Sequence, residues 1–460
     1  MGSIEPMTTL KRRFIGEGTQ FTNMFVTTPV CCPSRSSIFS GKYVHNNGAK
    51  NNSLEGNCAS HYWMQKQEPF AFPVYLKKAG YKTFFAGKYL NQYGFPEVGG
   101  AKHIPPGWDW WNGLIGASYY YNYPMSVNGT KIQHGEELKD YFTTVIQKHA
   151  LKFLKYADSY QPFFMMLCPT APHLPYSFLP QFNQTYTDKR VPRTPYWNHH
   201  SSDKHWVVRQ TPVAGMPQQV IDGADKGYRD RWRTLLSVDD MLKKILETLE
   251  QKSILDNTVI IYTSDNGYHL GQFVLPVGKG MPYEFDTRVP MVVRGPGVSV
   301  TNRSEPILNI DLAATVLDLA EAEIPKSMDG QSFQALIQPE HPRKPWSGRS
   351  QFLIEYWGAG FPEGSKECPH TENEYCGKSY GCICIDAINN TYSCVHTLTS
   401  EENSIYCEFK DSENFKEFYD LRKDPYQLTN AAKMLTPAKS KLYKKSLDAL
   451  KYCQGSSCKR

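Results

Sequence analysis

Short apolar runs alternate with longer segments of helical period along the first three quarters of the chain. Four apolar runs predict buried strands, at residues 82–86, 162–167, 258–263 and 289–293. Apolar side chains spaced three and four residues apart predict helices, at residues 140–156, 228–249 and 311–320. This alternation predicts an α/β fold with a mostly parallel central sheet that is flanked by helices.

The pattern changes beyond about residue 345. Short runs with strand character follow one another, at residues 351–356, 382–386, 392–397, 405–409 and 417–421, and a helical pattern covers residues 437–452. We therefore predict two parts: a large α/β domain over residues 1–345, and a smaller cysteine-rich α+β subdomain with an antiparallel sheet over residues 346–460.

Composition indicates a globular protein. The chain has 460 residues, of which 40% are hydrophobic and 13% aromatic. We find no apolar run near the roughly 20 residues that a membrane-spanning helix needs, so we expect no membrane span. The formal net charge of +6 suits an anionic substrate such as a sulfated glycan, although proteins with neutral ligands are often as basic. We expect no nucleic-acid partner.

Cysteines and glycosylation motifs indicate passage through an oxidising secretory route. Eight of the twelve cysteines lie in the last hundred residues, and their pairing cannot be read from the sequence. A zinc site is the rival explanation, but no C-x-x-C pair occurs. The motif N-x-S/T predicts N-glycosylation at five positions: Asn51, Asn128, Asn183, Asn302 and Asn389.

The amino terminus does not agree with a secretory route. Met1-Gly2-Ser3-Ile4 has no charged region followed by an apolar region, so the sequence carries no signal peptide. We therefore expect that the beginning of the chain is missing.

Charged and imidazole groups follow three of the predicted strands closely. Lys88 follows the first strand, His173 the second, and Asp265-Asn266 the third, with Lys279 shortly after. Each residue alone has an ordinary structural explanation, such as a surface lysine or a capping aspartate. Ligands bind at the carboxyl ends of strands in open α/β sheets, so we expect these groups to converge on one site.

Residues 31–42 read CCPSRSSIFSGK and contain the pattern C-x-P-S-R-x-x-x-x-x-G. This segment resembles the signature of the sulfatase family, and the stretches GKYLN, KHW and TSDNGYHLGQF resemble the same family. The resemblance covers almost the whole chain. It implies an alkaline-phosphatase-like fold, a bound calcium ion, and oxidation of Cys31 to formylglycine (3-oxoalanine) by the formylglycine-generating enzyme.

The resemblance implies five catalytic residues. The hydrated aldehyde made from Cys31 would be the nucleophile, because a gem-diol can attack sulfur with one hydroxyl and expel sulfate with the other. Arg35 would orient this group, and Lys88 and Lys279 would contact sulfate oxygens and stabilise their charge. His173 would act near the leaving group, as an acid or as a sulfate contact.

Further residues have supporting roles by resemblance. Asp265 and Asn266, together with the group at Cys31, would ligate calcium. His269 would contact the substrate, as Lys88, His173 and Lys279 would, and Lys42 would support the site. Many arylsulfatases have a histidine where this chain has Leu90, so that helper role stays unassigned.

Within the family, the resemblance is to lysosomal exo-enzymes that remove the 6-sulfate from N-acetylglucosamine 6-sulfate units of heparan and keratan sulfate. One alternative is an extracellular heparan 6-O-endosulfatase. Another is an inactive glycan-binding homologue, and a third is a phosphatase or phosphodiesterase of the same wider fold group. That third class has Ser or Thr where Cys31 stands, and the Pro-Ser-Arg context speaks against it.

Family members begin with an apolar strand that ends in a pair of metal-binding aspartates, and Met1 to Met7 resembles the segment just after that pair. We therefore expect two apolar strand edges without a partner, weak metal binding and little turnover for this chain.

Overall fold

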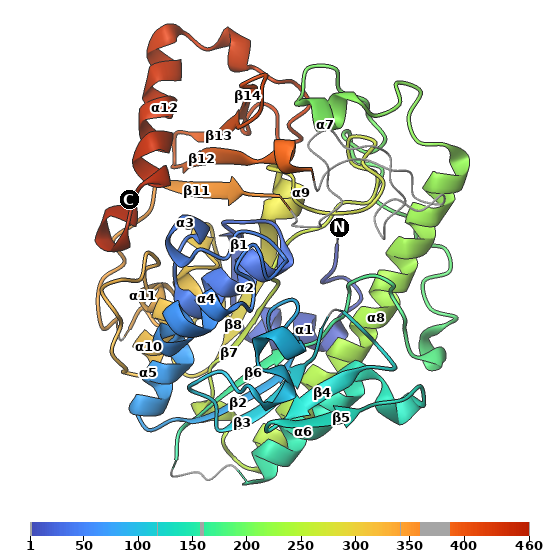
Figure 1. Cartoon of the computed structure of the whole chain (residues 1–460), viewed down its shortest axis with the longest axis vertical. Helices are drawn as coiled ribbons and strands as arrows, with labels where there is room; N and C mark the ends of the chain where they lie inside the picture. The colour runs from blue at the N-terminus through green and yellow to red at the C-terminus, as the bar shows by residue number, and fades with distance from the viewer. Residues whose placement is uncertain (1, 117, 157–160, 341, 359–386, 460) are drawn as a thin grey trace.

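The computed structural model describes residues 2–116, 118–156, 161–340, 342–358 and 387–459. Three sheets and the helices around them make up the fold (Figure 1). The strands of the first sheet follow the order β10-β1-β8-β7, with β9 also paired to β1. Their bounds are β1 Gly18–Phe25, β7 Ile260–Thr263, β8 Arg288–Arg294, β9 Thr301–Arg303 and β10 Ile307–Leu308.

The second sheet has the order β5-β4-β3-β2-β6. Strand β2 runs parallel to both β3 and β6, and the edge hairpin of β4 and β5 is antiparallel. The bounds are β2 Lys82–Gly87, β3 Trp110–Leu114, β4 Pro124–Val127, β5 Thr130–Gln133 and β6 Phe163–Cys168.

Helices cover both faces of the second sheet. On one face, α6 and α8 bury their apolar stripes against Phe84 and Ala86 of β2. On the other face, α2, α4, α5 and α10 surround Phe85 of β2 and Trp111 of β3. The α-helices run α1 Thr8–Arg13, α2 Cys31–Ser40, α3 Val44–Asn47, α4 His61–Lys66, α5 Phe72–Lys78, α6 Phe142–Tyr156, α7 Trp206–Arg209, α8 Gln218–Gln251, α9 Glu284–Thr287, α10 Asp311–Leu319, α11 Gln334–Ile337 and α12 Pro437–Lys451.

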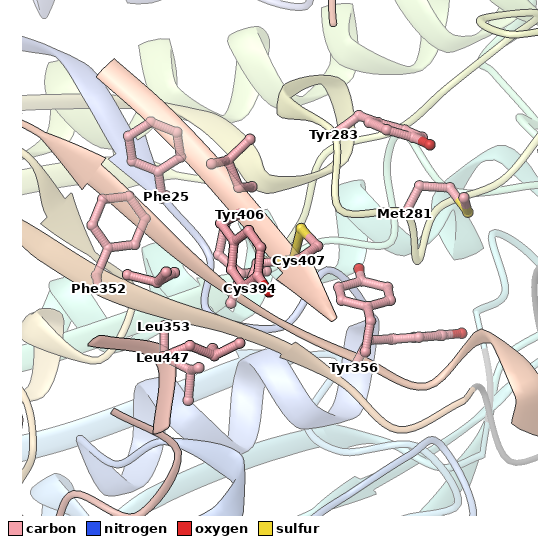
Figure 2. Packing of buried hydrophobic residues seen from close by; sticks show 14 of the residues in the cluster. Phe25, Met281, Tyr283, Phe352, Leu353, Tyr356, Cys394, Tyr406, Cys407 and Leu447 are labelled. Atoms are coloured by element: carbon pink, nitrogen blue, oxygen red, sulfur yellow. A yellow bond between two sulfur atoms is a disulfide. The ribbon is translucent and has the colours of Figure 1, made fainter. Parts of the chain in front are cut away.

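The third sheet is antiparallel and has α12 beside it, at the upper left of Figure 1. Its order is β11-β12-β13-β14, with bounds Gln351–Tyr356, Tyr392–Leu398, Asn403–Phe409 and Lys416–Asp420. Figure 2 shows its buried side chains together with Phe25, Met281 and Tyr283 of the larger part. One apolar core therefore joins this sheet to the segments around residues 25 and 281.

These elements confirm the α/β class and the antiparallel sheet near the carboxyl end. The two larger sheets are mixed rather than mostly parallel. In the first sheet β8 runs antiparallel to both β1 and β7, and in the second sheet β4 runs antiparallel to β3 and β5. The strand predicted at residues 382–386 lies outside the described residues. The domain boundary after residue 345 stays a prediction.

Strands β6 and β7 are each paired on one side only among the described residues. Strand β6 pairs with β2, and β7 pairs with β8. Every residue of both strands is partly exposed, although the sequences FFMMLC and IIYT are apolar. The expected pair of apolar strands with an open edge is therefore present.

Candidate active site

Cys31 is the first residue of helix α2. The preceding residue, Val30, is extended, and Pro33 fits the first helical turn, where a missing backbone donor costs nothing. Gly41 ends the helix in the left-handed conformation at φ 66°. The Cys31 thiol is free and only 2% exposed, whereas its neighbour Cys32 forms a disulfide with Cys58. The helix amino terminus favours negative charge at this position.

Two lysines and a histidine surround the Cys31 sulfur. Lys279 Nζ donates a hydrogen bond to Cys31 Sγ at 2.7 Å. Burial alone would raise the pKa of the thiol, but the charges of Lys279 and Lys88 and a hydrogen bond with His173 hold this pKa well below its ordinary value. If Cys31 were converted to a formylglycine hydrate, its oxygens would take the place of this sulfur, and the same cations would lie next to them.

Arg35 lies one turn along α2 and joins the loops after β2 and β7. Its Nη1 donates to Asp265 Oδ2 at 2.5 Å and its Nη2 to Asn91 Oδ1 at 2.6 Å, while Nε donates to the carbonyl of Tyr89. Arg35 as a whole is 4% exposed. Three planar contacts of this kind fix the orientation of the guanidinium between these loops.

Lys88 and His173 follow strands β2 and β6. Lys88 Nζ donates to Ser118 Oγ at 2.5 Å, and burial lowers its pKa to about 8. His173 Nδ1 donates to the carbonyl of Leu174 at 2.8 Å, which leaves Nε2 for Cys31. Burial and the charges of Lys88 and Lys279 lower the pKa of His173.

Asp265 and Asn266 follow β7 and carry oxygens suited to a hard cation. Burial alone would raise the pKa of Asp265, but Arg35, Lys279 and Lys88 hold it below its ordinary value, so the carboxylate is ionised. Asn266 Oδ1 is buried without a hydrogen-bond partner among the described residues, as expected of a metal ligand. These two groups fit part of a calcium site. However, the described part of the chain contains no group of three or more His, Cys, Asp or Glu side chains that could hold a metal.

His269 is completely buried behind the loop that carries Lys279. Its Nδ1 lies 3.0 Å from both carboxylate oxygens of Asp286, and its backbone exchanges two hydrogen bonds with Gly278. Burial raises the pKa of Asp286. The other ring nitrogen of His269 has no partner among the described residues. The role of His269 in substrate binding stays a prediction.

The structure thus brings together all five predicted catalytic residues, although their roles stay predictions. One supporting position lies apart from them. Lys42 follows the far end of α2, about 15 Å from Cys31, where burial lowers its pKa against the charge of Asp329. Leu90 packs in the apolar core, so the helper role stays unassigned. Sequence patterns missed Ser118, whose hydroxyl has no distinguishing motif.

The five predicted glycosylation sites differ in exposure. Asn128, Asn183 and Asn302 are exposed, whereas Asn51 and Asn389 are half-buried. Glycosylation at all five positions stays a prediction. No helix among the described residues is both long and apolar enough to span a membrane.

Comparison with known proteins identifies the family. A family model described as "Sulfatase" matches residues 2–322. The chain belongs to the sulfatase family. A second model, described as "N-sulphoglucosamine sulphohydrolase, C-terminal", matches residues 277–372. This sulfatase is therefore an enzyme, and its fold is the alkaline-phosphatase-like one.

Two sulfatases of known type are similar to this chain in sequence. The sulfatase is 44% identical over 466 residues to human N-acetylglucosamine-6-sulfatase, a match that covers 100% of this chain and 83% of the relative. It is 38% identical over 366 residues to the Drosophila melanogaster "Extracellular sulfatase SULF-1 homolog", covering 78% of this chain and 32% of that protein.

Solved structures support the fold. A structure "in complex with its substrate D-Glucosamine-2-N, 6-O-disulfate" superposes with a TM-score of 0.74 at 23% identity, covering 96% of this chain and 92% of that one. A phosphonate monoester hydrolase of Agrobacterium radiobacter gives 0.66 at 16% identity, covering 96% and 90%. These similarities establish the fold alone.

Proposed function

We propose that this sulfatase removes the 6-sulfate from N-acetylglucosamine 6-sulfate units of heparan and keratan sulfate. The observation that carries the proposal is the 2.7 Å contact between Lys279 Nζ and Cys31 Sγ, with Lys88 and His173 acting on the same sulfur. Cations around the nucleophile suit a sulfate ester, because its non-bridging oxygens carry a negative charge. The full-length similarity to N-acetylglucosamine-6-sulfatase supports the sugar specificity.

Catalysis by a formylglycine at position 31 consumes one water for each ester. One hydroxyl of the hydrated aldehyde attacks sulfur, the bond from sulfur to the sugar oxygen breaks, and that oxygen takes a proton. The second hydroxyl then loses its proton, the aldehyde re-forms, and sulfate leaves. Water hydrates the aldehyde again.

Residues of this chain have distinct tasks in these steps. Lys88 and Lys279 hold sulfate oxygens and stabilise the charge that develops on them. His173 gives a proton to the sugar oxygen, and its lowered pKa makes its imidazolium a stronger acid than an ordinary histidine. Arg35 orients the group at position 31.

We further propose that Asp265 and Asn266 contribute oxygens to a bound calcium ion together with the group at position 31. When bound, such an ion neutralises sulfate charge. We also propose that formylglycine-generating enzyme modifies Cys31, that the five sequons carry glycans, and that the enzyme acts in lysosomes after secretory transport.

The decisive experiment follows inorganic sulfate released from N-acetylglucosamine 6-sulfate and from longer heparan sulfate oligosaccharides. The full chain is expressed with formylglycine-generating enzyme, and Cys31→Ala is the control. Release from the monosaccharide and from chain ends supports the proposal. Release from internal units alone indicates an endosulfatase, and binding without release indicates an inactive glycan-binding protein. Either result would overturn the proposal.

A further inference from the structure

The loop that carries Lys279 has an unusual backbone. Lys279 stands between Gly278 at φ 154° and Gly280 at φ 99°, conformations that side chains other than glycine rarely adopt. Between Leu275 and Tyr283 the chain forms neither helix nor strand. Partners outside the loop must therefore determine where Lys279 points.

One set of partners comes from the larger part of the fold. The backbone of His269 exchanges hydrogen bonds with Gly278 at 2.9 and 3.2 Å, and the backbone N–H of Met281 donates to Asp286 Oδ2 at 3.0 Å. These contacts hold the loop on both sides of Gly280. They leave the Gly280 carbonyl, which lies next to Lys279, to other donors.

The donors to this carbonyl come from the antiparallel sheet. Tyr392 Oη at the start of β12 donates to the Gly280 oxygen at 3.1 Å, and Asn390 Nδ2 donates to it at 3.3 Å. Both residues are completely buried. The Tyr356 ring of β11 packs against Gly280. A Cβ atom at Gly280 would lie 2.9 Å from this ring, so the position has no room for a side chain. In Figure 2, Tyr356 and Met281 lie at the edge where this sheet meets the loop.

We propose that the antiparallel sheet positions the catalytic lysine: Asn390 and Tyr392 hold the Gly280 carbonyl and so direct Lys279 toward position 31. This inference rests on the proposed function and adds positioning residues from a sheet that supplies none of the five predicted catalytic residues. Two buried donors on one carbonyl restrict the peptide between Gly280 and Met281, which begins one residue after Lys279. A small misplacement of Lys279 lowers the rate steeply, since transition-state contacts depend on sub-ångström geometry.

The test is a double-mutant cycle between Tyr392→Phe and Lys279→Ala. Tyr392→Phe removes one hydroxyl and keeps the ring, and we expect kcat to fall roughly ten-fold with a smaller change in KM. In the Lys279→Ala background the same change should have almost no further effect, because its route to the reaction is already lost. Equal losses in both backgrounds would overturn the proposal, since they indicate a purely structural role.

Two further variants serve as a control and as a second test of the proposal. Tyr406→Phe removes a buried hydroxyl from the same sheet, one that contacts Glu408, and should leave kcat unchanged. Asn390→Ala removes the second donor but keeps the sequon at Asn389. It should lower kcat as Tyr392→Phe does, and it replaces Tyr392→Phe in the test if the Tyr392→Phe protein folds poorly. A wild-type kcat in Asn390→Ala would also contradict the proposal.

A binding measurement separates this inference from the proposed function. Inorganic sulfate should raise the thermal midpoint of the wild-type chain, and Tyr392→Phe should reduce that increment several-fold whether or not the chain turns over a sugar sulfate. Tyr406→Phe should keep the full increment. If the wild type binds sulfate but releases none from any ester, only the proposed function fails. An unchanged increment in Tyr392→Phe contradicts the positioning role.

Discussion

Lys279 Nζ lies 2.7 Å from Cys31 Sγ, although 248 residues separate them in the chain. The loop after β7 delivers the lysine and the first turn of α2 delivers the cysteine. A buried ammonium group at this distance stabilises an anion on the partner atom more strongly than it would in water. The same contact therefore favours ionisation at position 31 and the binding of a sulfate ester.

Removal of this charge should affect both ionisation and catalysis. In protein with an unmodified Cys31, Lys279→Met should raise the thiol pKa. Burial raises this pKa, and the charge of Lys279 is the largest of the influences that lower it. The ultraviolet absorbance of the thiolate, compared with Cys31→Ser, measures this change. In the converted enzyme, kcat should fall about 10²- to 10³-fold. Lys423→Met, at an exposed lysine, is the control; a Lys279→Met enzyme as fast as wild type would contradict the assigned role.

Lys88 should set the alkaline limit of activity. Its pKa is lowered to about 8 by burial, so the side chain is charged below that pH and becomes neutral as pH rises through it. A neutral lysine no longer attracts sulfate, so kcat/KM should decrease above about pH 8. A pH profile of sulfate release measures this limb. Lys88→Arg should shift this decrease in kcat/KM to higher pH, because a guanidinium stays charged. If the decrease stays at the same pH in Lys88→Arg, another group is titrating.

Calcium should bind weakly through Asn266. Its buried Oδ1, which has no hydrogen-bond partner among the described residues, and the neighbouring Asp265 carboxylate would supply two oxygen ligands, whereas calcium takes about six to eight. We expect the thermal midpoint of the chain to rise only at roughly millimolar calcium. Asn266→Ala should abolish the rise, and Asn266→Asp, which keeps an oxygen and adds charge, should restore it. A calcium response that survives in Asn266→Ala places the ion elsewhere.

Conversion of Cys31 should precede folding. In the folded chain Cys31 is 2% exposed and Arg35 is 4% exposed, so an enzyme that recognises this segment cannot reach it. Peptide mass spectrometry should find aldehyde at position 31 when formylglycine-generating enzyme is present during synthesis, and thiol when it is added to folded protein. A short unfolded peptide spanning residues 27–42 is the positive control. Equal conversion of folded protein would contradict this order.

Three of the four apolar runs predicted in the larger part lead to the candidate site. The strands predicted at residues 82–86, 162–167 and 258–263 correspond to β2, β6 and β7, and the residues after them converge on Cys31. The direction of β8 was not predictable, because the connection between Thr263 and Arg288 is long enough for either orientation.

Other features have no sequence signature. Helix α8 begins at Gln218 rather than Tyr228, because Val220 and Ala224 pack against small separate clusters that the main apolar stripe does not reveal. The contact between Tyr392 and Gly280 depends on how two distant segments pack. A tyrosine that donates to a backbone carbonyl looks, in sequence, like any other core tyrosine.

The backbone amides of β6 and β7 should be less protected from exchange than those of β1. The two strands share their apolar surroundings. One cluster contains Met165 of β6 and Tyr262 of β7, and a second cluster contains Met166 and Ile261, so alternate residues of both strands pack on the same two sides. Within the part of the chain that the structure describes, each has one edge that pairs with no strand, whereas β1 is paired on both sides. Amides of β6 and β7 should therefore exchange with deuterium about ten-fold faster than those of β1. Exchange mass spectrometry on peptides covering residues 163–168, 260–263 and 18–25 measures the difference, with β8 as the paired neighbour of β7. Protection equal to that of β1 would mean that something pairs with these edges in solution.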